Sequence, residues 1–148
     1  MGSLDDFFAR LSHVLKEDKR FKEDAYLFVM AGLGRASRKL SSPRHLTGGE
    51  LLVGLREEAG DQFGPMAVDV LQHWGVKNSL DFGRIVFNMV AQGILSKTEK
   101  DRLEDFEDPQ FFERLFDGRA EYRLVEKRST GKKAARTPNS IKKEVSNG

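Results

Sequence analysis

The sequence contains no cysteine among its 148 residues. A disulfide framework, a cysteine-ligated zinc site and a cysteine nucleophile are therefore excluded, and a reducing compartment is expected. Long apolar runs are also missing, because no stretch approaches the roughly 20 residues that cross a bilayer. The N-terminus, MGSLDDFFARL, is acidic and amphipathic, unlike the basic and then apolar start of a secretory signal. We therefore expect a cytoplasmic protein that makes no membrane contact.

Signatures of catalysis and of metal binding are equally scarce. His13, His45 and His73 lie far apart and form no HxxxH or HExxH arrangement. The carboxylates between Asp101 and Asp108 lack the ligand spacing and the mid-loop glycine of a calcium loop. We expect no catalytic residue, no metal site and no cofactor. An enzymatic hypothesis would require the fold to bring His45 or His73 beside two carboxylates in one cleft.

Charge is unevenly distributed along the chain. Residues 1–126 carry 18 Lys and Arg against 22 Asp and Glu, whereas residues 127–148 carry 7 against 1. The C-terminal stretch has almost no large apolar side chain, so it cannot offset the entropy lost on ordering, and we expect it to be disordered. The sequence thus divides into a helical domain, residues 1–125, and a disordered basic tail, residues 126–148.

The cations of this tail suit non-specific contact with the phosphates of nucleic acid or of the ribosome, and such binding weakens steeply with salt. A solubilising tail without a binding role is the alternative. The candidate nucleic-acid-binding residues of the tail are Lys127, Arg128, Lys132, Lys133, Arg136, Lys142 and Lys143.

Apolar residues recur at helical spacing through most of the body. The spacing predicts one helix from residue 4 to about residue 20 and a second from residue 21 to residue 40. Thr47 and Glu50 form a capping box ahead of a third helix, which ends near residues 60–64. Pro65 suits the first turn of a fourth helix, and Gly75 closes it.

The fifth helix covers residues 80–92, with Ser79 as its cap and Gly93 as its stop. Residues 94–106 can form either a small β wing or another helix capped by Ser96, and a final helix is expected from Pro109 onwards. We therefore predict a mainly α fold: a compact domain of five to six helices with a helix-turn-helix-like pair, with either the wing or the extra helix.

The helix-turn-helix-like pair has the element order of winged DNA-binding domains, whose second helix enters the major groove. At 100° per residue, the fifth helix presents Asp81, Arg84, Asn88 and Gln92 as an outer stripe. Arg, Asn and Gln are the residue types that pair with base edges, so Arg84, Asn88 and Gln92 are candidate nucleic-acid-binding residues. The negative charge of Asp81, at the start of this helix, would be repelled by the phosphates of DNA. A structural turn between packed helices is the alternative that we favour.

Two runs carry a resemblance to known proteins: RFKEDAYLFVMAGL and RHLTGGELLVGLREEAGDQFGPMAVDVLQHWGVKNSLDFGRIVFNMVAQGILSKTEKDRLEDF. These runs resemble a family of small bacterial helical proteins with no assigned function. The match covers residues 20–106, and FGPMA, WGV, IVFNMV and GILS are its most specific parts. The resemblance implies a bacterial, compact, mainly helical cytoplasmic module. It brings no catalytic or cofactor residue.

These observations favour a non-catalytic binding or adaptor module. In this hypothesis the helical body contacts a protein partner, and the basic tail contacts nucleic acid or the ribosome. A winged-helix-like DNA-binding regulator is the first alternative, and an enzyme is the last. The sequence predicts neither the identity of a partner nor the oligomeric state.

Overall fold

Five α-helices and two short 3₁₀ helices make up most of the described chain. The computed structural model describes residues 3–96 and 101–115. The mainly helical fold predicted from the sequence is confirmed. The helices are α1 (Ser3–Glu17), α2 (Glu23–Arg38), α3 (Gly48–Phe63), η1 (Gly64–Met66), α4 (Ala67–His73), α5 (Ser79–Ala91) and η2 (Leu103–Phe106).

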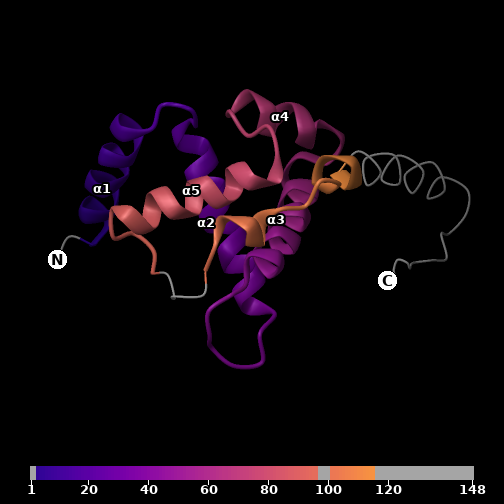
Figure 1. Ribbon diagram of the computed structural model, residues 1–148, viewed down its shortest axis with the longest axis horizontal. Helices are drawn as coiled ribbons and strands as arrows, with labels where there is room; N and C mark the ends of the chain where they lie inside the picture. Colours follow the sequence, from indigo (N-terminus) through magenta and orange to yellow (C-terminus); the bar gives the residue numbers. More distant parts are fainter. Residues whose placement is uncertain (1–2, 97–100, 116–148) are drawn as a thin grey trace, which may run out of the picture.

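The α2–α3 pair and α5 form the centre of the molecule (Figure 1). In this view α5 runs across the pair, with α1 towards its C-terminal end and α4 towards its N-terminal end, while η2 lies against α5 and α3. Glycines allow the close approach of α2 and α3. A Cβ added at Gly32 would lie 2.3 Å from Cδ2 of Leu55, and one at Gly54 would lie 2.9 Å from the Gly32 carbonyl oxygen.

Aromatic side chains join the helices in the core. The ring of Phe28 on α2 lies 5.9 Å from those of Phe63 and Trp74 and 6.2 Å from that of Phe82. Phe82 in turn contacts Phe111, at 5.2 Å between ring centroids, and both are fully buried. These contacts connect α2, α3, α4, α5 and the segment after η2 through a single aromatic cluster, and burial of this much apolar area is the main stabilising contribution.

The predicted signals at the start of α3 and after α4 and α5 are confirmed, whereas Pro65 lies in η1, the 3₁₀ helix directly before α4, and the cap of α5 needs a correction. Thr47 and Glu50 form the capping box of α3, and Gly75 and Gly93 adopt positive φ angles of 99° and 76° after α4 and α5. The cap of α5, however, is Asn78, whose side chain accepts a hydrogen bond from the Asp81 N–H, and Ser79 is the first residue of the helix. The Ser79 hydroxyl accepts instead from the backbone N–H of Asp108 at 2.8 Å.

The predicted β wing is not found in the described part of residues 94–106. No strand occurs within residues 3–96 and 101–115, and a 3₁₀ helix occupies residues 103–106. Residues 97–100 lie outside the described residues. Residues 111–115 are helical, in agreement with the start of the predicted final helix. The predicted domain boundary near residue 125 and the whole basic tail, residues 126–148, lie outside the described part.

No helix within residues 3–96 and 101–115 combines the length and the hydropathy that are needed to cross a bilayer.

Candidate functional site

The predicted outer stripe of α5 is largely engaged in contacts within the protein. Asp81 was expected to face outwards, but it is only 6 % exposed. One of its carboxylate oxygens accepts from Nη1 of Arg84 at 2.7 Å, and the other accepts from the backbone N–H of Lys77 at 2.8 Å. The expected orientation of Asp81 is therefore wrong, and Arg84 is held by this buried carboxylate.

Asn88 also points into the structure. Its side-chain nitrogen donates to Oδ2 of Asp18 at 2.9 Å and lies 3.1 Å from the hydroxyl of Tyr26. Hydrogen bonds from the Arg20 side chain, with a smaller contribution from Asn88, hold the pKa of Asp18 well below its usual range. Burial raises the pKa of Tyr26. Asn88 thus completes a polar network between α5, α2 and the loop after α1.

Gln92 lies at the C-terminal end of α5 and is partly buried. Its backbone carbonyl accepts from Nη1 of Arg10 at 2.8 Å, which ties α1 to the end of α5. Arg84 and Asn88 therefore lie on α5 as predicted, whereas Gln92 caps its C-terminal end, and the first two direct their polar atoms towards other side chains of the protein.

The turn between α4 and α5 packs against the loop between α1 and α2. The backbone N–H of Lys22 donates to the Trp74 carbonyl at 3.1 Å. At Gly75 an added Cβ would lie 2.1 Å from the Arg20 carbonyl oxygen, so only glycine fits there. On this side the turn is therefore packed against another loop of the protein.

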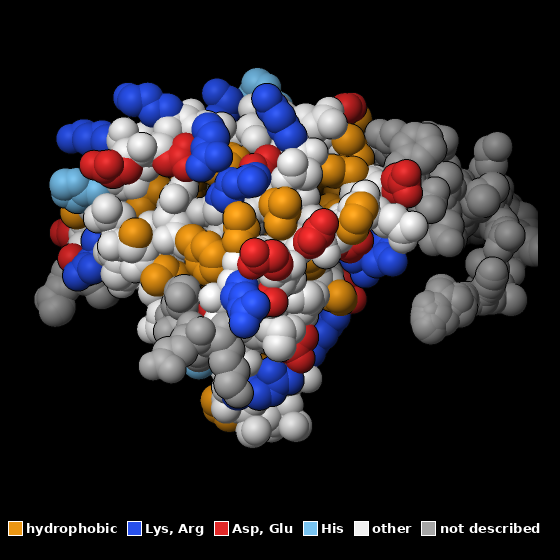
Figure 2. All heavy atoms as spheres, in the orientation of Figure 1, with side chains coloured by type: hydrophobic (Ala, Val, Ile, Leu, Met, Phe, Trp, Pro, Cys, Tyr) orange, Lys and Arg blue, Asp and Glu red, His pale blue; other side chains and the backbone are white. Residues whose placement is uncertain are grey.

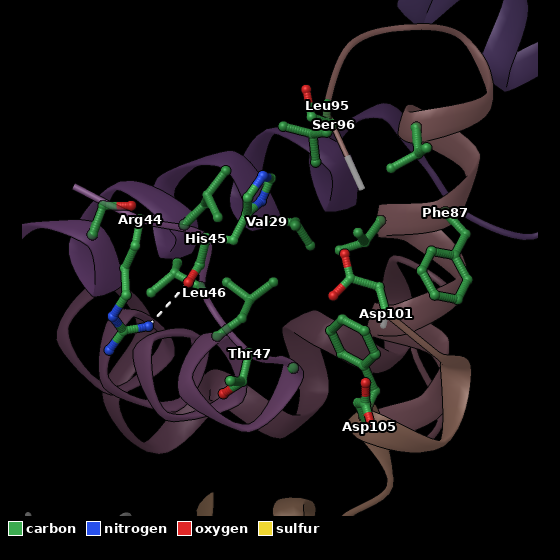
Figure 3. Close-up of a pocket in the computed structure, with 17 residues that line it drawn as sticks. Val29, Arg44, His45, Leu46, Thr47, Phe87, Leu95, Ser96, Asp101 and Asp105 are labelled. Atoms are coloured by element: carbon green, nitrogen blue, oxygen red, sulfur yellow. Dashed lines mark hydrogen bonds between the residues drawn. The ribbon is translucent and has the colours of Figure 1, made fainter. Parts of the chain in front are cut away.

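A hollow on another part of the surface is the strongest candidate for a binding site. It has a volume of about 250 Å³ and lies between α2, α3, α5 and the residues on either side of segment 97–100; we call it the α2–α3–α5 pocket (Figure 3). Ligand pockets that enclose a whole drug-sized molecule measure about 300–1,000 Å³, so this one suits side chains better than a cofactor. Its apolar lining includes Val29, Leu33, Leu51, Val86, Val90 and Phe106.

Two glycines allow η2 to close one side of the pocket. A Cβ at Gly48, the first residue of α3, would lie 2.7 Å from the carbonyl oxygen of Asp105. A Cβ at Gly83 on α5 would lie 2.7 Å from Phe106. The Phe106 ring also packs edge-on against Phe87, with the centroids 6.1 Å apart. The wall formed by η2 is therefore fixed against both α3 and α5.

The opposite rim is formed by the segment before α3. The guanidinium of Arg44 donates to both carboxylate oxygens of Glu50, at 2.9 and 2.8 Å. It also donates to the His45 carbonyl at 3.0 Å (Figure 3). The hydrogen bonds from Arg44, and to a smaller extent the one from the backbone N–H of Thr47, lower the pKa of Glu50 to about 2. The charge of Arg44 is therefore matched by Glu50, and the rim is held in one conformation.

The pocket brings His45 into one hollow with two carboxylates, Asp101 and Asp105. Figure 3 shows them on opposite sides: His45 lies on the segment before α3, whereas Asp101 and Asp105 lie on the wall that includes η2. Over residues 3–96 and 101–115, no group of three or more His, Asp or Glu residues is arranged to hold a metal ion. The arrangement offers an apolar floor with polar rims, which is the chemistry of a binding surface.

No pattern in the sequence predicts this pocket. Its walls come from segments that are far apart in the sequence, and neither helical periodicity nor any motif indicates which of them meet. Gly48 and Gly83 were the available signals, because glycine within or beside a helix often marks a close approach. Each becomes informative only when the position of η2 is known.

Comparisons with protein-family models, with curated proteins and with solved structures gave no match to this chain. The resemblance to a family of small bacterial proteins therefore stays a prediction. Function is inferred from the geometry and the charge of the site itself.

Proposed function

We propose that the protein is a non-catalytic binding module whose helical body takes up one or two apolar side chains of a partner protein in the α2–α3–α5 pocket. The observation that carries this proposal is the pocket itself, an apolar hollow of about 250 Å³ with polar rims. Protein interfaces commonly concentrate their binding energy in a few side chains that fill such pockets.

The surface around η2 supports this proposal. Figure 2 shows hydrophobic side chains exposed across the middle of one face, over α5, with acidic side chains beside them over η2. Apolar area that is rimmed by polar groups is typical of protein contact sites. The polar groups of the rim fix the orientation of the bound chain, and the apolar floor supplies affinity.

The proposal is tested by selecting peptides from a random display library on the full chain and measuring their binding to two variants. Ser37 is exposed and lines the pocket, so Ser37→Trp places a large side chain at its edge without changing the buried core. The selected peptides should contain an apolar anchor, and Ser37→Trp should weaken their binding roughly ten-fold or more.

Ser12→Trp is the matched control, because Ser12 is also exposed on a helix but lies outside the pocket lining. It should leave the affinity unchanged. Equal binding of the selected peptides to both variants would place the contact site elsewhere and contradict the proposal.

The basic tail is proposed to contact nucleic acid or the ribosome without reading sequence. Support comes from its seven Lys and Arg against one Glu. A salt titration of binding to random duplex DNA and to RNA tests this, using the full chain and a chain that ends at Glu126. Binding should fall with salt and be lost with the tail.

Duplex binding by the shortened chain would instead support the alternative, a DNA-binding regulator that uses Arg84, Asn88 and Gln92. That function would require the contacts between Arg84 and Asp81 and between Asn88 and Asp18 to be exchanged for contacts with bases. If neither chain binds, the tail proposal is wrong, and the pocket proposal is unaffected.

A further inference from the structure

We infer that the α2–α3–α5 pocket selects a partner segment in which an aliphatic side chain is followed directly by lysine or arginine. This inference rests on the proposed function, because it names the chemistry of the partner that the same pocket would bind. The apolar residue enters the hollow, and the basic residues that follow it meet the acidic wall on the η2 side.

The two walls of the pocket differ in charge. The wall on the η2 side includes Asp101 and Asp105, and the described residues 101–108, to which both belong, hold five Asp and Glu against one arginine. On the opposite rim Arg44 is matched by Glu50 through two hydrogen bonds. A bound segment therefore meets a negatively charged wall on one side. On the other side it meets a rim where the charge of Arg44 is balanced by that of Glu50.

Asp105 is suited to this role. It is exposed and lies within the fixed wall, because Oδ2 of its carboxylate accepts from the backbone N–H of Arg102 at 3.1 Å. The backbone of Asp105 also rests on Gly48 at the start of α3. The carboxylate is thus presented at a set place beside the hollow, and a lysine or arginine of the partner can reach it from solvent.

The apolar part of the segment is limited by size and lining. Val29 and Leu51 at the floor are almost fully buried, and Val86 and Val90 are partly exposed beside them. The hollow of about 250 Å³ is lined mostly by aliphatic side chains, with Phe87 and Phe106 on the η2 side, and it has room for an aliphatic side chain such as leucine or isoleucine. The pocket therefore combines an aliphatic anchor with a basic flank, and charge complementarity of this kind gives specificity more than affinity.

The test uses synthetic octapeptides with blocked ends, measured by fluorescence anisotropy against the full chain. Three peptides share one isoleucine, followed by two lysines, two glutamines or two glutamates, and a fourth has serine in place of isoleucine before two lysines. Affinity should fall from the lysine to the glutamine to the glutamate peptide. The serine peptide should bind far more weakly than its isoleucine counterpart.

Asp105→Asn should weaken the lysine peptide by a factor of about 1.5–5, the range for one exposed ion pair, and leave the glutamine peptide unchanged. Asparagine keeps an oxygen that can accept from Arg102. Asp69→Asn removes the same charge from an exposed site on α4 outside the pocket lining and should leave both peptides unchanged. On the unaltered chain, added salt should reduce the preference for lysine over glutamine.

The outcomes separate this inference from the proposed function. Equal affinity for the lysine and glutamine peptides, with the serine peptide still weak, would overturn charge selection and leave the pocket as an apolar binding site. Isoleucine peptides that bind no better than the serine peptide would overturn the proposed function. Binding that appears only after residues 127–148 are removed would mean that the chain's own tail, which contains Ile141 before two lysines, occupies the pocket. That result would overturn the inference that the pocket binds a separate partner protein.

Discussion

The side-chain nitrogen of Asn88 lies 2.9 Å from Oδ2 of Asp18, which joins the middle of α5 to the loop that follows α1. The same nitrogen lies 3.1 Å from the Tyr26 hydroxyl. Tyr26 is fully buried, and the Asp18 side chain is only 13 % exposed. A single amide therefore satisfies two polar groups that water reaches poorly, so Asn88 has a structural role.

Asn88→Ala should lower the free energy of unfolding by about 1–3 kcal/mol, because it removes the hydrogen bond to the buried Tyr26 hydroxyl and one of the hydrogen bonds to the Asp18 carboxylate, which keeps those from Arg20. Urea denaturation followed by circular dichroism measures this loss. Gln92→Ala is the control: it removes a side-chain amide at the C-terminal end of the same helix, but the contact of Gln92 with Arg10 uses its backbone carbonyl. Equal effects of the two variants would contradict the structural role of Asn88.

Arg84→Ala should lower the free energy of unfolding by about 1 kcal/mol, because it removes one partner of the buried Asp81 carboxylate while the N–H of Lys77 remains. Nucleic-acid binding by the full chain should not change, since Arg84 is already paired. A loss of sequence preference in duplex binding by the variant would instead support base reading by α5.

Gly75→Ala should destabilise the protein by several kcal/mol. Its φ of 99° is unfavourable for alanine, and the added Cβ would lie 2.1 Å from the Arg20 carbonyl oxygen, a backbone atom that cannot move without displacing the loop. Thermal unfolding measures the change. The expected result is a large fall in the melting temperature or a failure to fold.

Gly60→Ala is the matched control for Gly75→Ala. Gly60 lies within α3, and nothing lies within 4 Å of an added Cβ. Alanine should therefore raise the free energy of unfolding by about 0.5–1 kcal/mol through its higher helix propensity. A similar loss of stability in both variants would mean that the contact with Arg20 is not the cause.

The ion pair between Arg44 and Glu50 should make stability depend on pH in the acid range. The pKa of Glu50 is about 2 in the folded protein, against an ordinary value of 4.5. The unfolded chain therefore takes up the proton at higher pH, and this contribution to stability is present above pH 4.5 and lost as the pH falls towards 2. Glu50→Gln should reduce that loss.

Urea midpoints measured across this pH range test the prediction, and glutamine keeps the capping-box acceptor at the start of α3. Glu17→Gln serves as the control, because Glu17 is exposed and forms no ion pair with another described residue. An unchanged acid dependence in Glu50→Gln would show that other carboxylates account for it.

Local signals in the sequence predicted most of the helix boundaries. Thr47 and Glu50 gave the start of α3, and Gly75 and Gly93 marked helix ends, because capping and positive φ depend on neighbouring residues alone. The prediction that Asp81 belongs to the outer stripe of α5 is wrong. Placing residues at 100° steps assumes that only one face of the helix is covered by the rest of the protein. The α1–α2 loop and η2 also cover α5, and only their placement shows which polar residues they bury.

The candidate site could not be predicted from the sequence for a similar reason. Its residues come from α2, the segment before α3, α5 and η2, and no local pattern predicts that these meet. The acidic residues between Asp101 and Asp108 lack the pattern of a calcium loop, and their sequence predicts no other site; Asp105 is exposed. Its position beside an apolar hollow depends on long-range packing against Gly48.

The contact between Gly75 and the Arg20 carbonyl links two loops that are 55 positions apart in the sequence. During synthesis the α4–α5 turn therefore leaves the ribosome long after the loop on which it packs. Closing so long a chain segment is slow compared with forming either helix. If residues 67–91 were moved alone into another protein, they would lose the α1–α2 loop, which fixes the angle between α4 and α5. In the native protein a longer turn between α4 and α5 would not fit against Arg20.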